Sequence, residues 1–421
     1  MLPRKLPRQL PAGRTTVRAA IAFPVIGPPI APAFVTVESG RVLEISTAQS
    51  TVNYADLGDV ALLPALVNAH THLEFSDLPA PIAAGRGGFA SWIRAVVAER
   101  QTRWSTVGAA ERDAELAKVR RQGLEESIEV GVAFVGEIAT TLDPVPATAG
   151  TGGLNFLELL GLDPQRQPSL VERARQHLAQ GKVDSWHPGL SPHAPYTIDP
   201  ELLSRLCALA TQFDAPVAMH VAESREELEL LRSHSGSLVD TMRSLDAWFP
   251  GRLPRGIEPG DYLRILSNAP RALVIHGSFL GPDDWTFLAA QPQMHVVFCP
   301  RTHAGFHPGR YPLLELLQAG VRVAVGTDSR ASTPNLSMLD ELRSIARSHG
   351  DVSPREILEL GTIRAAAALG ASDRYGGIGP GRVASFAAVQ LPDESWTDGD
   401  ALLEELFHST RPASLIFQLQ E

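Results

Sequence analysis

The feature that most constrains this chain is a repeated alternation of short apolar segments with longer helical patterns from Val60 to Leu369. Such an alternation predicts a parallel sheet whose strands are joined by crossover helices. Eight segments have the composition of strands: Ala61–Asn68, Ala133–Glu137, Asn155–Leu160, Gly189–His193, Pro216–His220, Ala272–His276, His295–Cys299 and Val321–Gly326. Eight β/α units predict a closed (β/α)8 TIM barrel, an α/β fold whose chemistry lies at the C-terminal ends of its strands.

Shorter β segments flank this region on both sides. They are Thr16–Phe23, Ala33–Glu38 and Arg41–Ile45 before it, and Ser385–Val389 and Ser414–Gln418 after it. We expect the two groups to pair into one small β-sandwich beside the barrel. The predicted domains are therefore residues 1–59 for the N-terminal part of the sandwich, 60–375 for the barrel and 376–421 for the C-terminal part. Met1–Arg14 is basic and rich in proline, and we expect a frayed tail there.

The helical patterns between the strands have ordinary lengths for a globular protein. They cover Phe89–Gln101, Ala109–Glu129, Pro200–Thr211, Glu226–Ser233, Met338–Arg347 and Pro354–Leu369.

Composition excludes several classes of function. The formal net charge is −10, which argues against a nucleic-acid or anionic-membrane surface because phosphate binding needs an excess of Lys and Arg. No stretch approaches 18 consecutive apolar residues, so we expect no membrane span. Two cysteines, Cys207 and Cys299, cannot build a disulfide framework or a Cys-x-x-Cys zinc site. We expect a cytoplasmic protein with a small-molecule substrate, and the oligomeric state stays open, with a homodimer as one option.

Polar residues stand where apolar strands end. Asn68-Ala-His70-Thr-His72 follows the first strand, His220 and His276 end the fifth and sixth, and Asp328 follows the eighth. In a barrel these ends converge on one mouth. Alternation along a strand also places His70 and His72 on the same side of the chain. Three histidines and one aspartate are suitable ligands for Zn²⁺ or Fe²⁺, with one position left for water.

Each of these residues also has an ordinary structural explanation. A His-x-His pair arises by chance, a histidine at a strand end is often a turn residue, and Asp328 could cap the following helix. Four coincidences at strand ends of one predicted barrel favour a single metal site. Glu223, three residues after His220, stands where it could carry a proton, although it could also be a surface residue at the start of a helix.

At these positions the chain resembles the amidohydrolase superfamily. The matching motifs are Leu63-Pro-Ala-Leu-Val-Asn-Ala-His-Thr-His72, His220-Val-Ala-Glu223, His276 and Gly326-Thr-Asp-Ser329. The resemblance covers nearly the whole chain. It implies His70, His72, His220 and Asp328 as metal ligands, and Glu223, His276 and Asp328 as catalytic groups. The chain departs from the usual Pro-Gly at Pro64-Ala65 and from the usual Gly-Lys-x-Ala-Asp at Gly381-Arg-Val-Ala-Ser385, both outside the predicted metal site.

The fourth strand end indicates the branch of the superfamily. Dinuclear members carry a bridging lysine there, whereas this chain reads Leu190-Ser-Pro-His-Ala-Pro-Tyr196. The resemblance therefore implies one divalent cation, for which we rank Zn²⁺ before Fe²⁺, although the sequence does not distinguish the two. It also implies similarity to cytosine, S-adenosylhomocysteine and aminodeoxyfutalosine deaminases and to triazine chlorohydrolases. In that chemistry a metal-bound hydroxide adds to a ring carbon, Glu223 protonates the adjacent ring nitrogen, and ammonia leaves.

Three further residues are candidates for substrate binding. Glu74 in His72-Leu-Glu corresponds to a carboxylate near ribose hydroxyls in related nucleoside deaminases, and His193 would face the base or the ribose. Arg301, after Cys299-Pro, stands where related deaminases usually have an uncharged residue, and its guanidinium could pair with a substrate carboxylate. The structural alternatives are an exposed loop position for Glu74, a turn position for His193 and an outer salt bridge for Arg301.

Aminodeoxyfutalosine, an intermediate of menaquinone biosynthesis, ranks first as substrate because its adenine, ribose and benzoate groups could use all three residues. S-adenosylhomocysteine, methylthioadenosine, adenosine and guanine-type heterocycles follow. A chlorohydrolase, another C–N hydrolase or an inactive binding protein on the same barrel are the remaining alternatives. The chain has no Gly-x-Ser-x-Gly elbow, and Gly150-Thr-Gly-Gly153 lacks the spacing of nucleotide-binding loops, which disfavours a serine hydrolase and a nucleotide-dependent enzyme.

Overall fold

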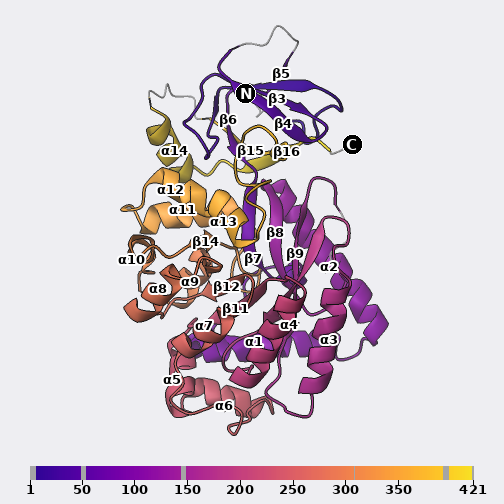
Figure 1. Cartoon of the computed structure of the whole chain (residues 1–421), viewed down its shortest axis with the longest axis vertical. Coiled ribbons are helices and arrows are strands. Elements are labelled where there is room, and N and C mark those ends of the chain that lie inside the picture. The colour runs from indigo at the N-terminus through magenta and orange to yellow at the C-terminus, as the bar shows by residue number, and fades with distance from the viewer. Residues whose placement is uncertain (1–5, 49–53, 144–147, 308, 392–397, 420–421) are drawn as a thin grey trace.

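The computed structural model describes residues 6–48, 54–143, 148–307, 309–391 and 398–419. Its centre is an eight-stranded parallel sheet in which each strand pairs with the next along the chain, in the order β7 to β14 (Figure 1). The strands are β7 (Leu66–Thr71), β8 (Val132–Ala139), β9 (Gly152–Leu159), β10 (Trp186–Pro192), β11 (Val217–Val221), β12 (Ala272–His276), β13 (Met294–Phe298) and β14 (Val323–Val325). The predicted TIM-barrel fold is confirmed.

The first and last strands of the sheet close the barrel. The backbone N–H of Asp328, just after β14, donates to the carbonyl oxygen of His70 on β7 over 3.1 Å. The Asn68 amide donates to the Thr327 hydroxyl over 2.8 Å, and the Thr327 N–H donates back to the Asn68 side-chain oxygen over 3.1 Å. These bonds fix the last strand against the first, and with it the residues that follow both strands.

Helices surround the barrel. They are α1 (Gly88–Trp104), α2 (Ala109–Glu129), α3 (Gln167–Ala179), α4 (Pro200–Gln212), α5 (Arg225–Ser233), α6 (Ser237–Ser244), α7 (Pro259–Leu266), α8 (Pro282–Ala289), α9 (Pro300–Phe306), α10 (Leu313–Gln318), α11 (Met338–Ser348), α12 (Pro354–Leu360), α13 (Ile363–Ala368) and α14 (Gly399–His408), with short 3₁₀ turns at Leu73–Phe75 and Gly85–Gly87.

Several of these helices begin as their sequences predict, with a proline in the first turn or a side-chain cap. Asp199, for example, accepts a hydrogen bond from the Leu202 N–H at the start of α4. The single helix expected over Pro354–Leu369 is instead two, α12 and α13, separated at Gly361-Thr362. Within the described ranges, no helix has the length and apolar character needed to cross a membrane.

Two four-stranded sheets form the second part of the molecule, at one end of the barrel (Figure 1). One has the order β4 (Arg41–Ser46), β3 (Ala33–Glu38), β1 (Thr15–Ala19), β5 (Tyr54–Asp56). The other has the order β16 (Ala413–Phe417), β15 (Ser385–Gln390), β6 (Val60–Pro64), β2 (Ile21–Ala22). The second sheet joins both ends of the chain, as the predicted sandwich requires, and one apolar cluster containing Val35 and Ile416 spans the two sheets.

The expected first barrel strand, Ala61–Asn68, is divided between two sheets. Its first half is β6, which pairs antiparallel with β15 in the sandwich, and its second half is β7 in the barrel. The division falls at Pro64-Ala65, where proline cannot donate a backbone hydrogen bond to continue a ladder. The exact domain limits therefore stay a prediction, with the change from sandwich to barrel placed between β6 and β7.

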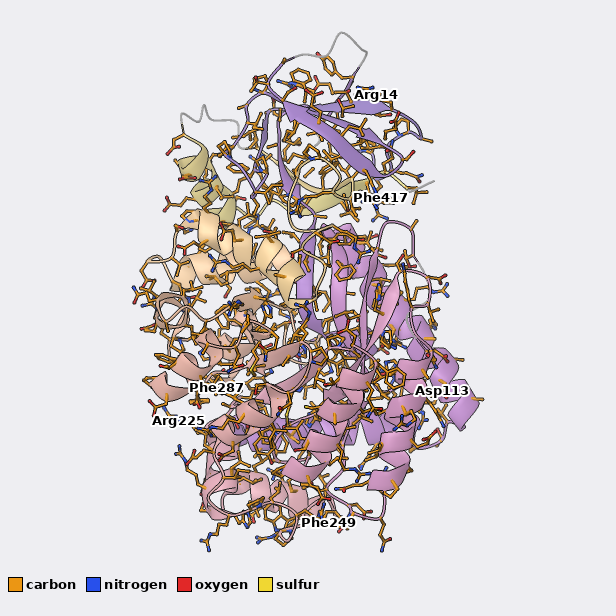
Figure 2. The ribbon with its side chains drawn as sticks, in the orientation of Figure 1. Arg14, Asp113, Arg225, Phe249, Phe287 and Phe417 are labelled. Carbon is orange, nitrogen blue, oxygen red and sulfur yellow. The ribbon has the colours of Figure 1, made fainter. Side chains whose placement is uncertain are left out.

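The expectation of a frayed N-terminal tail is wrong for its described part. Leu10 is buried, its N–H donates to the carbonyl oxygen of Phe417, and the Phe417 N–H donates to the carbonyl oxygen of Arg8. Phe417 itself lies at the junction of sandwich and barrel (Figure 2), where its ring approaches Gly150 in the loop before β9. The tail and the last strand thus hold each other against the barrel.

We predict that Gly326→Ala destabilises the barrel at its closure. A Cβ at this position would lie 2.7 Å from the backbone oxygen and 2.8 Å from the Cβ of His70, and neither atom can move without shifting β7. Overpacking of this kind costs about 1–3 kcal/mol. Calorimetry should show a lower Tm than for Gly350→Ala, whose added Cβ meets no atom within 4 Å. Equal Tm values for the two variants would contradict the prediction.

Candidate metal and catalytic site

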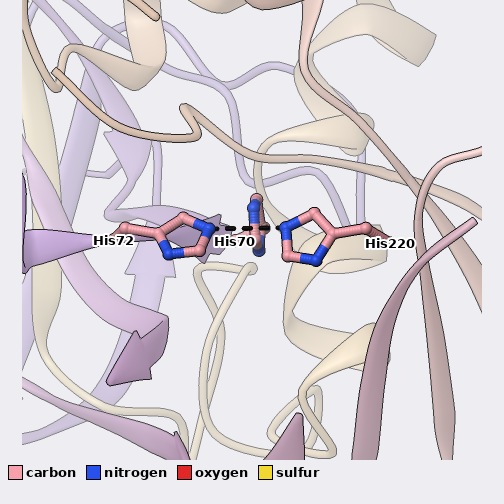
Figure 3. A group of neighbouring side chains, drawn as sticks. All are labelled: His70, His72 and His220. Carbon is pink, nitrogen blue, oxygen red and sulfur yellow. Dashed lines mark hydrogen bonds between the residues drawn. The ribbon is translucent and has the colours of Figure 1, made fainter. Parts of the chain in front are cut away.

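Three histidines meet at the barrel mouth: His70 on β7, His72 immediately after it, and His220 on β11. His70, His72 and His220 each offer a ring nitrogen, and these atoms all lie within 4.8 Å of one another. The Nε2 atoms of His72 and His220 are 3.4 Å apart (Figure 3). The ring centroid of His70 lies 4.9 Å from that of His72 and 5.0 Å from that of His220, so the three rings form a triangle. The predicted convergence of the three histidines is confirmed, and the group is a candidate metal site.

The strand pattern explains how His220 enters the site. It lies two residues after Ala218, whose side chain belongs to the barrel interior, so alternation along β11 directs it to the same side. Its Nδ1 is 3.0 Å from the carbonyl oxygen of His193, which can only accept, so Nδ1 carries the proton and donates. The unprotonated Nε2 is then left for a cation, as is usual for histidine ligands.

The chemistry of the histidines fits a bound divalent cation. His70 is fully buried, and neither of its ring nitrogens has a hydrogen-bond partner among the described residues. Burial, together with the neighbouring His220, holds the pKa of His70 well below its ordinary value; burial likewise lowers that of His72, and that of His220 to about 4. A neutral imidazole with a free nitrogen is a good metal ligand. A buried ring nitrogen without any partner costs folding free energy, and a bound cation would supply that partner.

Asp328 faces the same group. Its Oδ1 lies 3.7 Å from the Nε2 of His70 and 3.9 Å from that of His72. Its other oxygen, Oδ2, accepts hydrogen bonds from the hydroxyls of Thr302 and Ser332, over 3.0 Å and 2.9 Å. Two hydroxyls therefore orient the carboxylate so that one oxygen points toward the histidines. Its backbone φ of +58° is unfavourable for aspartate and is held by the seam with β7.

Glu223 and His276 lie together beside the histidines. The Oε1 of Glu223 is 3.4 Å from the Nε2 of His276, and both side chains are buried. Burial raises the pKa of Glu223 well above its ordinary value, and the carboxylates of Asp328 and Glu227 add to this. A carboxyl group that keeps its proton near neutral pH can act as a general acid.

The backbone around Glu223 is fixed by a second acid. The buried Glu227 carboxylate accepts hydrogen bonds from the N–H groups of Ala222 and Glu223, over 2.8 Å and 3.0 Å. Ser224 caps α5 by accepting from the Glu227 N–H. His276 is held at a positive φ of +67°, and its carbonyl oxygen accepts from the Tyr311 hydroxyl over 2.7 Å. Both catalytic candidates are thus rigidly placed.

A cavity of about 320 Å³ opens over the histidines. His72, His193, His220, Glu223, His276 and Asp328 line its polar side. Phe75, Trp92, Ile93, Val96, Val97, Leu160, Met242, Leu245 and Ala247 form most of the remaining wall. His193 is among the lining residues, with its Nδ1 2.9 Å from the Thr197 hydroxyl, and its contact with a substrate stays a prediction.

Glu74 does not line this cavity. Its carboxylate accepts hydrogen bonds from the backbone N–H and the hydroxyl of Thr140, over 2.7 Å and 2.8 Å, and from Arg100 over 3.1 Å. These donors hold the carboxylate outside the cavity lining. The position of Glu74 therefore gives no support to the expectation that it binds ribose hydroxyls.

Arg301 also lies outside the cavity lining. Its Nε donates to the buried carboxylate of Glu341 over 2.6 Å, and its other nitrogens donate to the side chain and the backbone of Asn335. These bonds join α9 to α11 and to the segment before it. The expected pairing with a substrate carboxylate is therefore not supported, because the guanidinium is turned into the protein.

Sequence reasoning missed Thr302, Ser332 and Glu227, which orient candidate catalytic groups, and Arg100 and Glu158, which line the cavity. Glu158 had a usable signal, since it is a polar residue near the end of the apolar strand β9. Glu227 and Ser332 lie only four or five residues from the groups they orient. Thr302 and Arg100 had no local signal, because each acts through a contact between distant parts of the chain.

We predict that each chain binds one zinc ion, and that the substitutions His70→Ala and His220→Ala each abolish zinc binding. Plasma mass spectrometry after dialysis should find about one equivalent in the parent and almost none in the variants. The exposed His408→Ala is the control. A ligand that binds only the folded state stabilises it, so chelation should lower the Tm of the parent and of His408→Ala but not that of the two site variants. Full metal content in either site variant would contradict the assignment.

We predict that Arg301→Met lowers stability without changing substrate preference. The variant leaves Glu341, which is 0% exposed, without its cation, and such a loss typically costs 3–5 kcal/mol. Thermal unfolding should show a clear drop in Tm, partly restored in Arg301→Met/Glu341→Leu. A selective loss of activity on carboxylated substrates, with unchanged Tm, would instead place Arg301 at the substrate.

Comparison with known proteins agrees with this geometry. The profile of the amidohydrolase family matches residues 61–417. The aminodeoxyfutalosine deaminase of Deinococcus radiodurans is 30% identical over 319 residues, which is 70% of this chain and 70% of that protein. A 5-methylthioadenosine/S-adenosylhomocysteine deaminase of Moorella thermoacetica is 26% identical over 413 residues, 90% of this chain and 86% of the relative.

Solved structures share the fold. The Helicobacter pylori aminofutalosine deaminase in complex with methylthio-coformycin has a TM-score of 0.80 at 22% identity and covers 94% of this chain and 97% of its own. A zinc-bound adenosine deaminase from Xanthomonas campestris has a TM-score of 0.73 at 22% identity, covering 98% and 94%. The family match, which spans both the barrel and the returning sandwich strands, shows that the chain is a hydrolase that belongs to the amidohydrolase family.

Proposed function

We propose that the chain is a mononuclear, metal-dependent deaminase that hydrolyses the amino group of an adenine nucleoside. The observation that carries the proposal is the pairing of a buried Glu223 with His276, 3.4 Å apart, at the wall of the cavity that contains the histidine group. Hydrolytic deamination of an aromatic ring needs both a nucleophile and a proton for the ring nitrogen. The site offers residues for each.

The ligands we propose are His70, His72, His220 and Asp328. Zinc is the preferred cation because the set consists of three nitrogens and one oxygen. Zinc is also bound in the structure of the Xanthomonas campestris adenosine deaminase. These residues would hold the cation, which when bound would lower the pKa of a water toward about 7 and so supply hydroxide at neutral pH.

The protein's own groups then handle protons. The Oδ1 of Asp328 and the Nε2 of His276 face the space above the histidines. From there these two groups orient the attacking water and receive its proton. Glu223 donates its proton to the ring nitrogen next to the carbon under attack, because aromaticity is lost as the carbon becomes tetrahedral. As this adduct collapses to the carbonyl, the proton taken from the water passes to the amino group, which leaves as ammonia, and the proton of the new hydroxyl returns to Glu223. His193, at the same wall, is placed to contact the heterocycle.

Aminodeoxyfutalosine is the first substrate to test, because the relative at 30% identity carries that activity in its name. A second candidate, 5-methylthioadenosine, is favoured by the cavity. Its wall is largely apolar, and among the described residues that line it Arg100 supplies the one guanidinium or ammonium group, which is already bound to Glu74. An apolar thioether is easier to accommodate there than a free carboxylate.

The test is an ammonia-release screen of the zinc-loaded enzyme over aminodeoxyfutalosine, 5-methylthioadenosine, S-adenosylhomocysteine, adenosine, guanine and cytosine. Chloride release from a chlorinated triazine is measured in parallel, because the same set of metal ligands could serve an enzyme that expels either ammonia or chloride. Ammonia from an adenine nucleoside supports the proposal. Chloride release alone, or no turnover of any compound, would overturn it.

We predict that Glu223→Gln retains zinc and loses about 10²–10⁴-fold in kcat, because an amide cannot deliver the proton. The exposed Glu201→Gln on α4 is the matched control and should turn over at the parent rate. Metal content and kcat are measured on the same preparations. A Glu223→Gln enzyme near the parent rate would show that another group protonates the ring.

A further inference from the structure

A second cavity, of about 380 Å³, lies at the opposite end of the barrel from the histidines. Its wall comes from the N-terminal ends of the strands: Phe134 lies near the start of β8, His187 near the start of β10, and Arg271 directly before β12. The chemistry of a TIM barrel takes place at the C-terminal strand ends, so this cavity is not the catalytic one. Its volume nevertheless lies in the range typical of small-molecule sites, about 300–1,000 Å³.

The polar lining of this cavity carries an excess of positive charge. Lys182, Arg271 and Arg374 line it, and among the described residues of the lining Asp214 supplies the one carboxylate. Asp373 lies near Arg374, with 3.9 Å between its Oδ1 and the guanidinium Nε, but its side chain is 77% exposed and does not belong to the lining. These cations gather in a chain whose formal net charge is −10, and such a concentration of positive charge attracts anions.

Arg271 is a half-buried cation that forms no ion pair with any carboxylate in the described ranges. Its Nη1 donates to the backbone oxygen of Ala367 over 2.7 Å. Burial lowers the pKa of Arg271, and Asp214, which acts in the opposite direction, does not offset this effect. Charges that are taken out of water are normally paired, and an anion in the cavity would supply the missing partner.

The cavity also offers a neutral hydrogen-bonding group and an apolar surface. Burial, together with Lys182 and Arg374, lowers the pKa of His187, so its imidazole is uncharged at neutral pH and can donate one hydrogen bond. Phe134 of the barrel interior and Leu369, which follows α13, supply apolar lining. A ligand that uses both kinds of lining has a negative charge at one end and an apolar group at the other.

We propose that this cavity is a second binding site, which takes a phosphate monoester that carries an apolar group. A phosphate monoester has a charge of about −1.5 to −2 at pH 7 and three acceptor oxygens, which suits three cations set against one carboxylate. A ligand carboxylate would compensate only half of that excess. The site goes beyond the deamination chemistry, because no residue that lines it also lines the catalytic cavity.

The experiment is titration calorimetry of the zinc-loaded full chain with phenyl phosphate, inorganic phosphate and phenol. Phenyl phosphate should bind about ten-fold or more tightly than inorganic phosphate, because its ring buries apolar surface. Phenol, which has the same ring without the charge, should give no measurable binding. Added salt should weaken the binding of phenyl phosphate, because it screens the attraction between the phosphate and the partly exposed cations.

A pair of double variants locates the binding. Lys182→Met/Arg374→Met removes two of the three cations and should weaken phenyl phosphate about ten- to a hundred-fold, the loss expected for hydrogen bonds to charged groups. The matched control, Lys118→Met/Arg347→Met, removes the same charge from exposed positions on α2 and α11 and should bind like the parent. Thermal unfolding checks that both variants fold, and Lys182→Met alone, at an exposed position, gives the same readout if the double variant is unstable.

Several outcomes would overturn the proposal. Equal affinities for phenyl phosphate and inorganic phosphate would remove the argument for an apolar group. An unchanged affinity in Lys182→Met/Arg374→Met would place the ligand elsewhere, for example at the metal. Equal weakening in the control would reflect only the net charge of the protein. Absence of phenyl phosphate binding to the parent would show that the cavity is not a site for such esters.

Discussion

The site depends on the hydrogen bonds that join β7 to β14. The carbonyl oxygen of His70 accepts from the N–H of Asp328, so the bond that closes the barrel also fixes the distance between two candidate ligands. Gly326 allows this approach because a side chain there would collide with His70. The positive φ of Asp328 is maintained by the same seam. Barrel closure and site geometry are therefore one structural event, and neither is obtained without the other.

A second layer of contacts leaves selected atoms free. The His193 carbonyl occupies the Nδ1 of His220, the hydroxyls of Thr302 and Ser332 occupy one oxygen of Asp328, and Glu227 holds the backbone of Glu223. In each case one side of the functional group is fixed by protein and the other faces the cavity. Such preorganisation is the main source of electrostatic catalysis, because the dipoles need not reorient during the reaction.

Patterns within short stretches of the sequence predicted the barrel fold and the group of three histidines. Strand alternation and the convergence of parallel strands were enough to bring His70, His72 and His220 together, and the alternating β/α units gave the barrel. They failed where the answer lies in a distant partner. Arg301 was expected at the mouth, but its direction is set by Glu341, which no local pattern relates to it. Likewise, the uninterrupted apolar run 61–68 hides the change from sandwich to barrel, because both sheets bury it.

The order in which the chain is synthesised gives the split sandwich a further meaning. The ribosome makes β6 before the barrel, but it makes β15, the neighbour of β6 in the sheet, after the barrel. It makes β16, whose Phe417 pairs with the N-terminal segment at Gln9, later still. Until β15 has been synthesised, β6 has an unpaired edge on the side where β15 will lie, and an unpaired apolar edge promotes aggregation. The sandwich can therefore be completed only after the whole barrel region has been made, so the last step of its folding is a pairing between segments more than 300 residues apart.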